Sequence, residues 1–543
     1  MRPWKRRLLR ALHHDRNGGE SGMKAPVSAS TSVGTAAAAP GEDAAHKQIR
    51  GSSLLLAGRI LSLGVNFAVQ VIIIRYLSKT DYGAFAYALS LVSVGASIAT
   101  FGLDRSITRF VPIYDERGDY GKLFGTVVMA VGTVVSIGLV SVALVFGLQG
   151  VLAGSLISDE RAISVLLVLI VLSPIQALDG LLMGMFAVFS KPRAIFFRKY
   201  VLAPALRLII VLLLVLGNQG VIFLAAGYVA SGALGVALYS VMLYRMLRSE
   251  RLLERFSFGS MEIPAREVLG FTIPLLTSDL VFIAMHTSDV VLLGHFHGAA
   301  DVADFRVVAP AAVLNMLVMT SFTLLYTPLA ARMFARDDRE GINRLYWQTA
   351  IWIAVLSFPI FALTFSLAGP VTVTLFGSRY ADSATYLALL SLAYYFNAAL
   401  GFNGLTLKVF GRLRYIVSIN ITAALVNVGI NILLIPRYGP LGAAIGTSAT
   451  LVAHNILKQA GLLLGTGVRL FQVRDVGVYA SIAVCAGLLL LVQLLLSPPA
   501  YVAFALAVLA SLAVVAFSRK SLRAAQTFPE LMRFRLARLI AGG

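Results

Sequence analysis

The chain of 543 residues is 58% hydrophobic and 13% charged, and its mean hydropathy is +0.82. This composition excludes a soluble globular protein and predicts an all-α, polytopic integral membrane protein; a barrel would show short alternating segments. A formal net charge of +20 could indicate binding to nucleic acid. The distribution of the charged residues along the chain indicates instead that they orient the protein in the membrane. The single cysteine, Cys485, can form no internal disulfide, and neither a metal site nor a cofactor is expected.

About fourteen transmembrane helices can be placed along the chain. Residues 1–50 lack the apolar core of a signal peptide, so we predict a flexible, basic cytoplasmic tail. We then predict an N-terminal six-helix bundle (51–266), a C-terminal six-helix bundle (267–466), two further helices (467–518) and a basic cytoplasmic tail (519–543). The predicted spans lie near residues 53–75, 84–103, 123–148, 163–189, 197–217, 221–244, 268–294, 304–328, 346–368, 384–407, 415–435, 441–464, 475–496 and 499–517.

Lysine and arginine recur in every second loop of this arrangement. The predicted inner loops include Arg105 and Arg109, which also lie at the inner mouth of any central cavity, and the pair Lys191 and Arg193. Cytoplasmic loops carry an excess of Lys and Arg, so both termini are predicted to lie in the cytoplasm. One missed or extra span would invert the alternation from that point on, so an even number of spans is favoured.

Two pairs of segments repeat between the halves of the chain. Residues 71–85 (VIIIRYLSKTDYGAF) resemble residues 290–305 (VVLLGHFHGAADVADF), and the polar loop 114–124 resembles residues 336–346. Apolar composition alone can produce such matches by chance, but a match in a polar loop argues against chance. Six spans is an even number, so we predict two parallel, pseudo-symmetric bundles with a binding site between them near mid-membrane.

Three ionisable residues interrupt the seventh predicted span. Asp279, His286 and Asp289 fall within an arc of roughly 80° on a helix of 3.6 residues per turn. Ionisable groups inside a membrane are costly and usually functional, so these three, with Asp179 in span 4, are candidates for coupling to H⁺ or Na⁺. The plainer alternatives are local capping or pairing by Asp279 and a bond from His286 to a neighbouring helix.

Four stretches carry a resemblance to a known family. They are residues 75–85 (RYLSKTDYGAF), 102–110 (GLDRSITRF), 289–305 and 434–444 (LIPRYGPLGAA). With the predicted layout of two bundles and two extra helices, they resemble the polysaccharide (O-antigen type, Wzx-like) flippases. These flippases belong to the multidrug/oligosaccharidyl-lipid/polysaccharide (MOP) exporter superfamily, and the resemblance runs from about residue 51 to 518.

The resemblance implies a V-shaped, two-lobed bundle that works by alternating access and is not an enzyme. It implies translocation of a polyprenyl-diphosphate-linked oligosaccharide from the cytoplasmic to the outer leaflet of the cell (inner or plasma) membrane, for polysaccharide biosynthesis. An ion gradient or the membrane potential would drive the step. The implied partners are the lipid-linked glycan, the lipid bilayer, and a polysaccharide polymerase with its assembly proteins; nucleic acid is not expected.

Such a cargo needs cations for its diphosphate and polar groups for its glycan. The predicted substrate-binding residues are Arg59, Asn66 and Gln70 in span 1, Arg207 in span 5 and Arg306 in span 8. The resemblance supports Arg59 and Arg306, because related flippases carry cavity arginines in spans 1 and 8. The plainer alternatives are that Arg59 snorkels to the inner surface and that Arg306 pairs with Asp304.

Other polar residues within spans are further candidates. Lys458 in span 12 is a fourth cation. Asn420, Asn427 and Asn431 share one face of span 11, where they are suited either to sugar hydroxyls or to helix-to-helix packing.

Two other classes of protein are weighed against a flippase. A multidrug or cation antiporter of the same superfamily would favour acidic over cationic cavity residues, and the arginines above argue against it. A membrane glycosyltransferase, polymerase or ligase needs a large outer loop with catalytic groups, whereas the predicted outer loops are short. The sequence contains no Walker A pattern, so nucleotide hydrolysis is not expected.

Overall fold

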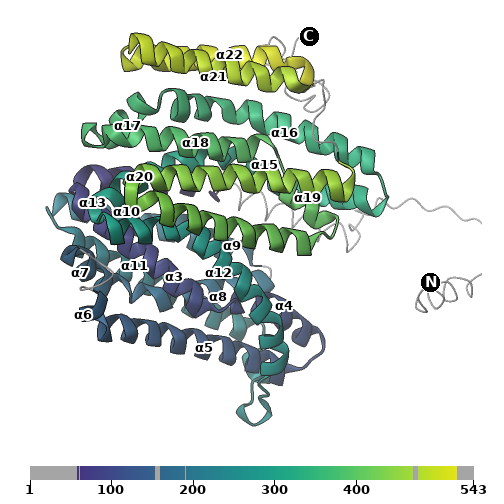
Figure 1. Cartoon of the computed structure of the whole chain (residues 1–543). Coiled ribbons are helices and arrows are strands. Elements are labelled where there is room, and N and C mark those ends of the chain that lie inside the picture. The colour runs from purple at the N-terminus through teal and green to yellow at the C-terminus, as the bar shows by residue number, and fades with distance from the viewer. Residues whose placement is uncertain (1–57, 60, 153–158, 190, 469–474, 523–543) are drawn as a thin grey trace, which may run out of the picture. The chain divides into compact units, whose positions relative to one another are not determined.

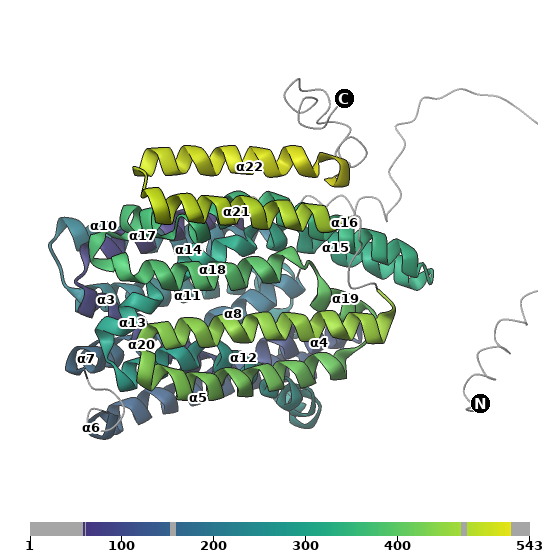
Figure 2. The same cartoon turned by 45° about the horizontal axis from the view of Figure 1, so that its top comes forward.

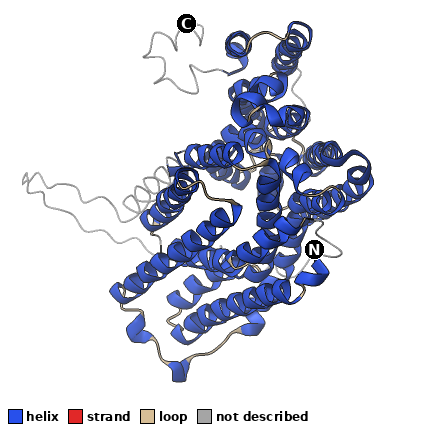
Figure 3. Cartoon of the chain, turned by 90° about the vertical axis from the view of Figure 1, so that its left-hand side faces the viewer, coloured by secondary structure: helices blue, strands red, loops and turns tan. Residues whose placement is uncertain are grey.

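An apolar chain in hydrocarbon must satisfy its backbone hydrogen bonds internally, which favours helices. The computed structural model describes residues 58–59, 61–152, 159–189, 191–468 and 475–522, and every regular element among them is a helix (Figure 3). All of these residues belong to one unit, Gly51–Gly543; the other unit, Met1–Arg50, lies outside the described residues. The predicted all-α membrane fold is confirmed, while the N-terminal tail and nearly all of the C-terminal tail fall outside the description.

The bounds of the helices follow the order of the chain. The first half contains the helix Leu61–Tyr76, α3 (Lys79–Thr100), α4 (Leu103–Glu116), α5 (Tyr120–Gly147), α6 (Gln149–Val151), α7 (Glu160–Leu169), α8 (Leu172–Val188), α9 (Pro192–Phe196), η2 (Phe197–Leu202), α10 (Ala203–Leu216), α11 (Val221–Ser249), η3 (Leu253–Arg255) and η4 (Phe258–Ser260). The second half contains α12 (Ala265–Phe296), α13 (Ala299–Arg306), α14 (Ala309–Val313), η5 (Leu314–Met316), α15 (Leu317–Ala335), α16 (Arg339–Phe361), η6 (Ala362–Ser366), α17 (Ala368–Phe376), η7 (Ser378–Ser383), α18 (Ala384–Ala399), α19 (Asn403–Val409), α20 (Leu413–Thr466), α21 (Val476–Leu496) and α22 (Ala500–Leu522).

Eleven helices in the described residues are long and apolar enough to cross a membrane. One of them, α20, is 54 residues long and kinks at Gly439, where φ is 53°, so the predicted spans 11 and 12 are its two halves. The shorter helix Leu61–Tyr76 and the 32-residue helix α12 occupy the predicted spans 1 and 7. The chain is therefore a multi-pass membrane protein, and the number of fourteen spans stays a prediction.

Three predicted segments have a different local structure. The predicted inner loop after residue 103 is helix α4, which follows α3 after Gly102, a glycine at φ 69°. Predicted span 8 is broken into α13, α14, η5 and α15, with Pro310 in the first turn of α14. Predicted span 5 begins as the π-helix η2, which carries Arg198.

The helices pack in two groups, which we call the N-bundle (residues 61–249) and the C-bundle (residues 265–466). Within each group the helices pack mainly on one another, and the largest contacts between the groups join α3 to α13 and to α12. Helices α21 and α22 lie side by side, and α22 packs on α16 of the C-bundle (Figures 1 and 2). Because the described contacts of α21 and α22 are with the C-bundle, we expect them to move with it.

The apolar cores of the two bundles are joined at one end and separate at the other. One continuous core contains Ile73 of the N-bundle together with Val302 and Phe358 of the C-bundle. At the other end, Val111 belongs to a core that the N-bundle forms with Val268 of α12, and Trp347 belongs to a distinct core of the C-bundle. By the predicted topology, the joined end faces outward and the divided end faces the cytoplasm.

Candidate functional site

A cavity of about 660 Å³ lies between the two bundles. The helix Leu61–Tyr76 and α3 form its wall on the N-bundle side, and segments of α12, α13, α14, η5 and α15 form its wall on the C-bundle side. Its polar lining consists of Arg59, Asn66, Gln70, Tyr82, Ser90, Ser93, Ser97, Thr287, Arg306 and Thr320. Aromatic and aliphatic side chains, Phe67 and Phe85 among them, make up the rest. A site of this size that combines apolar walls with converging polar groups is typical of ligand pockets.

The structure gathers the predicted substrate-binding residues at this cavity. Arg59, Asn66, Gln70 and Arg306 line it, although Arg306 is far from the others in sequence. Arg207 is not part of the lining, but its Nη1 donates a hydrogen bond to Oδ1 of Asn66 at 3.3 Å. Their roles in binding a substrate stay predictions.

Arg306 is held by the N-bundle and not by the neighbouring carboxylate. Its Nη2 donates to Oγ of Ser90 at 2.9 Å. Asp304, which we had considered as its partner, pairs instead with Lys79, whose Nζ lies 2.7 Å from Oδ2. The Nε atom of Arg306 is buried and has no acceptor in the described part of the chain. The guanidinium therefore keeps hydrogen-bonding capacity at the cavity wall.

Asn66 and Gln70 are oriented by hydrogen bonds within the N-bundle. Asn66 Nδ2 donates to the carbonyl oxygen of Ser62 at 2.7 Å and to its Oγ at 3.0 Å. Gln70 Nε2 donates to the hydroxyl of Tyr82 at 3.0 Å. These bonds fix the polar face of the helix Leu61–Tyr76 before any ligand enters.

A row of serines on α3 is a part of the site that we missed in the sequence. Ser90, Ser93 and Ser97 donate their hydroxyl protons to the carbonyls four residues earlier, at 2.8, 2.9 and 2.9 Å. Their oxygen lone pairs can still accept hydrogen bonds. The spacings of three and four residues place them on one helix face, and this signal was present in the sequence.

The described lining of the cavity carries two guanidinium groups and no carboxylate. Because screening is weak in low-dielectric surroundings, uncompensated cations attract an anionic ligand more strongly there than in water. The cavity therefore suits a ligand with a negative group and hydroxyl groups.

Among the four candidates for ion coupling, two have described side chains. Asp289 on α12 is 5% exposed, and its Oδ1 accepts a hydrogen bond from the backbone of Val290 at 2.8 Å. Asp179 pairs with Arg198, whose Nη2 lies 2.8 Å from Oδ1, in the interior of the N-bundle. The side chains of Asp279 and His286 lie outside the described residues. Ion coupling stays a prediction for all four.

The asparagines of span 11 contact neighbouring helices. Asn427 Oδ1 accepts a hydrogen bond from Ser288 Oγ of α12 at 3.1 Å, and Asn431 is fully buried beside it. Asn420 Oδ1 lies 2.8 Å from His454 Nε2. Of the two interpretations of these residues, helix-to-helix packing is the one that the contacts favour.

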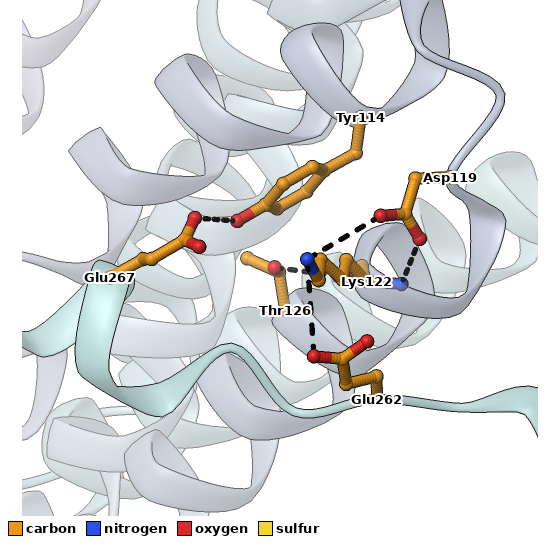
Figure 4. A network of polar contacts seen from close by, with 6 residues as sticks. All are labelled: Tyr114, Asp119, Lys122, Thr126, Glu262 and Glu267. Carbon is orange, nitrogen blue, oxygen red and sulfur yellow. Dashed lines mark hydrogen bonds and ion pairs between the residues drawn. The ribbon is translucent and has the colours of Figure 1, made fainter.

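At the end predicted to face the cytoplasm, a polar network holds the chain that leads into α12 (Figure 4). The hydroxyl of Tyr114 on α4 donates to Oε2 of Glu267 on α12 at 2.7 Å. Nζ of Lys122 lies 3.7 Å from Asp119 and 3.9 Å from Glu262, which precedes α12. Nearby, the exposed Arg109 of the predicted inner mouth lies over the ring of Phe271, 4.4 Å from its centroid. Polar contacts therefore accompany the apolar packing of α12 against the N-bundle at this end.

The chain is a multi-pass membrane protein with a cavity between two helical bundles. The family described as polysaccharide biosynthesis proteins matches residues 49–334, more than half of the chain, and the chain belongs to this family. The predicted family resemblance is thereby confirmed.

Two curated relatives match more than half of this chain. The "Uncharacterized membrane protein MJ1068" of Methanocaldococcus jannaschii is 22% identical over 417 residues, which cover 74% of this chain and 81% of that protein. The "Succinoglycan biosynthesis transport protein ExoT" of Rhizobium meliloti is 25% identical over 343 residues, which cover 61% of this chain and 63% of that protein.

Solved structures share the fold. The lipid II flippase MurJ in an inward closed conformation superposes with a TM-score of 0.64 at 16% identity, covering 87% of this chain and 99% of that chain. An inward-facing multidrug resistance transporter of the MATE family, from the MOP superfamily, superposes with a TM-score of 0.60 at 14% identity. The match covers 73% of this chain and 92% of that chain. At these identities the likeness concerns the fold alone.

Proposed function

We propose that this protein moves a polyprenyl-diphosphate-linked oligosaccharide from the cytoplasmic to the outer leaflet, for cell-surface polysaccharide biosynthesis. The observation that carries the proposal is the cavity lining with Arg59 and Arg306 and no carboxylate among its described residues. Guanidinium groups bind phosphate oxygens through paired donors, so they suit the diphosphate. The serine row and the amides of Asn66 and Gln70 suit glycan hydroxyls. The family and the description of the Rhizobium relative as a succinoglycan transport protein support the same cargo class.

Alternating access is the proposed mechanism. The joined core around Ile73 and Val302 and the divided cores around Val111 and Trp347 support an inward-facing assignment of this structure. In this state the head group would enter from the cytoplasmic side. Opening the joined end and closing the divided end would then present the same cavity to the outer leaflet.

The proposal also includes the ion gradient that drives transport and the membrane in which the protein lies. We assign the driving force to an H⁺ or Na⁺ gradient, with Asp289 as a coupling carboxylate, because it is buried on α12, the helix that contacts both bundles. We assign the protein to the cell (inner or plasma) membrane with both termini in the cytoplasm, on the basis of the Lys and Arg distribution. It would act as a transporter and not as an enzyme, and hand its cargo to polysaccharide polymerase and assembly proteins.

The proposal is tested in proteoliposomes that carry a polyprenyl-diphosphate oligosaccharide in one leaflet. A glycosidase added outside reports the appearance of the glycan in the other leaflet, with and without an ion gradient. Protein-dependent appearance supports the proposal. Absence of glycan transfer together with gradient-driven efflux of an organic cation would assign the protein to the multidrug antiporters, whose cationic substrates the described cavity lining does not suit.

A further inference from the structure

Two lysines of the C-bundle have no acidic partner in the described residues. Lys458 on the second half of α20 is half-buried, and Lys408 on α19 is exposed. In the part of the chain that the structure describes, neither ammonium group has a hydrogen-bond acceptor or an ion pair. Arg198 and Arg306, by contrast, bond to Asp179 and Ser90. The two lysines are therefore uncompensated.

The backbone of α19 brings the two lysines to one place. The side chain of Lys458 crosses α19 at Gly404, where its Cδ and Cε lie 3.8 Å from the position that a Cβ would take. Gly404 and Lys408 are four residues apart, so they share one face of α19. Lys408 therefore lies one turn along α19 from the glycine that the Lys458 side chain crosses.

Three asparagines extend from these lysines toward the central cavity. Asn455, one turn before Lys458 on α20, accepts a hydrogen bond from Asn403 and donates one to Asn397. Asn397 Nδ2 in turn contacts Sδ of Met316 at 3.6 Å, and Met316 lines the cavity. The lysines thus lie beside a polar path inside a bundle that is otherwise largely apolar.

A half-buried ammonium group loses part of its hydration, and a second cation nearby raises the cost further. An oxyanion offsets both costs, because it accepts charge-assisted hydrogen bonds from lysine and can also bond to amides. We propose that Lys458 and Lys408, with the asparagines beside them, form an anion-binding site in the C-bundle for a phosphate or carboxylate group. The site is separate from the central cavity, and it does not depend on the proposed transport function.

The two sources of such a group are a soluble oxyanion and the phosphate of a lipid head group. The first test uses the full chain in maltoside detergent, which contains no phosphate. Inorganic phosphate is titrated against chloride at constant ionic strength, and the rise of the thermal midpoint gives an apparent affinity. Phosphatidylglycerol dispersed in the same detergent is titrated in parallel. Tighter binding of the lipid than of inorganic phosphate assigns the site to a head group, and the reverse assigns it to a soluble anion.

The variants decide whether the response comes from this site. Lys458→Gln should weaken binding of the tighter probe about tenfold or more, because one charge-assisted hydrogen bond is lost, and Lys408→Gln should weaken it less. Lys458→Arg keeps the charge and should keep binding. Lys191→Gln is the matched control, since Lys191 is also predicted at the inner surface but is paired with Glu250 at 2.8 Å. An equal response in all four variants, or no response of the unsubstituted protein to either probe, would overturn the proposal.

Discussion

Lys79 at the start of α3 and Asp304 in α13 form an ion pair that joins the N-bundle to the C-bundle, with Nζ 2.7 Å from Oδ2. Ser383 Oγ also donates to Asp304, at 3.4 Å. By the predicted topology this pair lies at the outer end of the cavity, where the two apolar cores are joined.

At the same end, one arginine from each bundle donates a hydrogen bond to a backbone carbonyl of the other bundle. Arg75 of the N-bundle donates from Nε to the carbonyl of Leu375 at 2.8 Å, and Arg379 of the C-bundle donates to the carbonyl of Ile74. Under the proposed alternating access, both bonds must break, together with the joined apolar core, before the cavity can open outward.

Removing the charge of Asp304 should loosen the outer closure. A partly exposed ion pair contributes about 1 kcal/mol, so Asp304→Asn should shift the ratio of closed to open forms about fivefold. Spin labels at Gln219→Cys and Arg437→Cys, in a Cys485→Ser background, measure the distance across this end. Asp337→Asn is the control, because it breaks the exposed pair with Arg339 inside the C-bundle. An unchanged distance distribution in Asp304→Asn would contradict the role of the pair.

A side chain at residue 83 should prevent the outer closure altogether. A Cβ on Gly83 would lie 1.7 Å from the carbonyl oxygen of Ala299, which is backbone and cannot move aside alone. Gly83→Val should therefore lengthen the label distance and reduce transport at least tenfold while the protein still inserts. Gly132→Val is the control, since nothing lies within 4 Å of its Cβ position. Equal transport by the two variants would show that α3 and α13 need not close.

At the inner end, the bond from Tyr114 to Glu267 should hold the first turn of α12 (Figure 4). Tyr114→Phe removes one hydrogen bond to a charged group, a loss of about 1.5 kcal/mol or more. Amide hydrogen exchange at residues 265–272 should accelerate about tenfold. Tyr415→Phe, which removes a bond to the carbonyl of Leu457, should leave these amides unchanged. Unchanged exchange in Tyr114→Phe would mean that the contact between Ser106 and Thr272, 2.6 Å between hydroxyl oxygens, suffices.

The pair of Asp179 and Arg198 should be needed for stability. Asp179→Asn leaves a buried guanidinium without its counter-charge and should cost about 2 kcal/mol in unfolding free energy, measured as a lower thermal midpoint. The double variant with Arg198→Gln should recover part of that loss. Glu250→Gln, which breaks an exposed pair, is the control and should cost less than 1 kcal/mol. If Asp179→Asn keeps full stability but loses ion-driven transport, its role is coupling instead.

Hydropathy predicted most of this fold, because the bilayer imposes helices of known length on apolar segments. Charges inside such segments pointed to Arg59 and Arg306, since an uncompensated cation in hydrocarbon is costly and stands out. The break of span 8 could not be predicted, because a single residue, Pro310, is compatible with either a kink or a helix start.

The sequence also could not predict which charged residues pair with residues far away in the chain. Lys79 lies between predicted spans 1 and 2, and its ion pair with Asp304 depends on how α3 packs against α13. Arg198 stands at the start of predicted span 5 and is 8% exposed within the N-bundle, where it pairs with Asp179. Sequence position gives the depth of a charge in the membrane but not the helix that it faces.

The most direct measurement is glycan transfer by proteoliposomes with Arg59→Gln and Arg306→Gln, alone and combined. We expect each single variant to slow transfer about tenfold or more and the double variant to abolish it, since each removes a charge-assisted bond to the diphosphate. Arg339→Gln, an exposed arginine outside the cavity, should transfer at the normal rate. Normal transfer by the double variant, inserted and folded as the unsubstituted protein is, would contradict a cationic cavity as the site of transport.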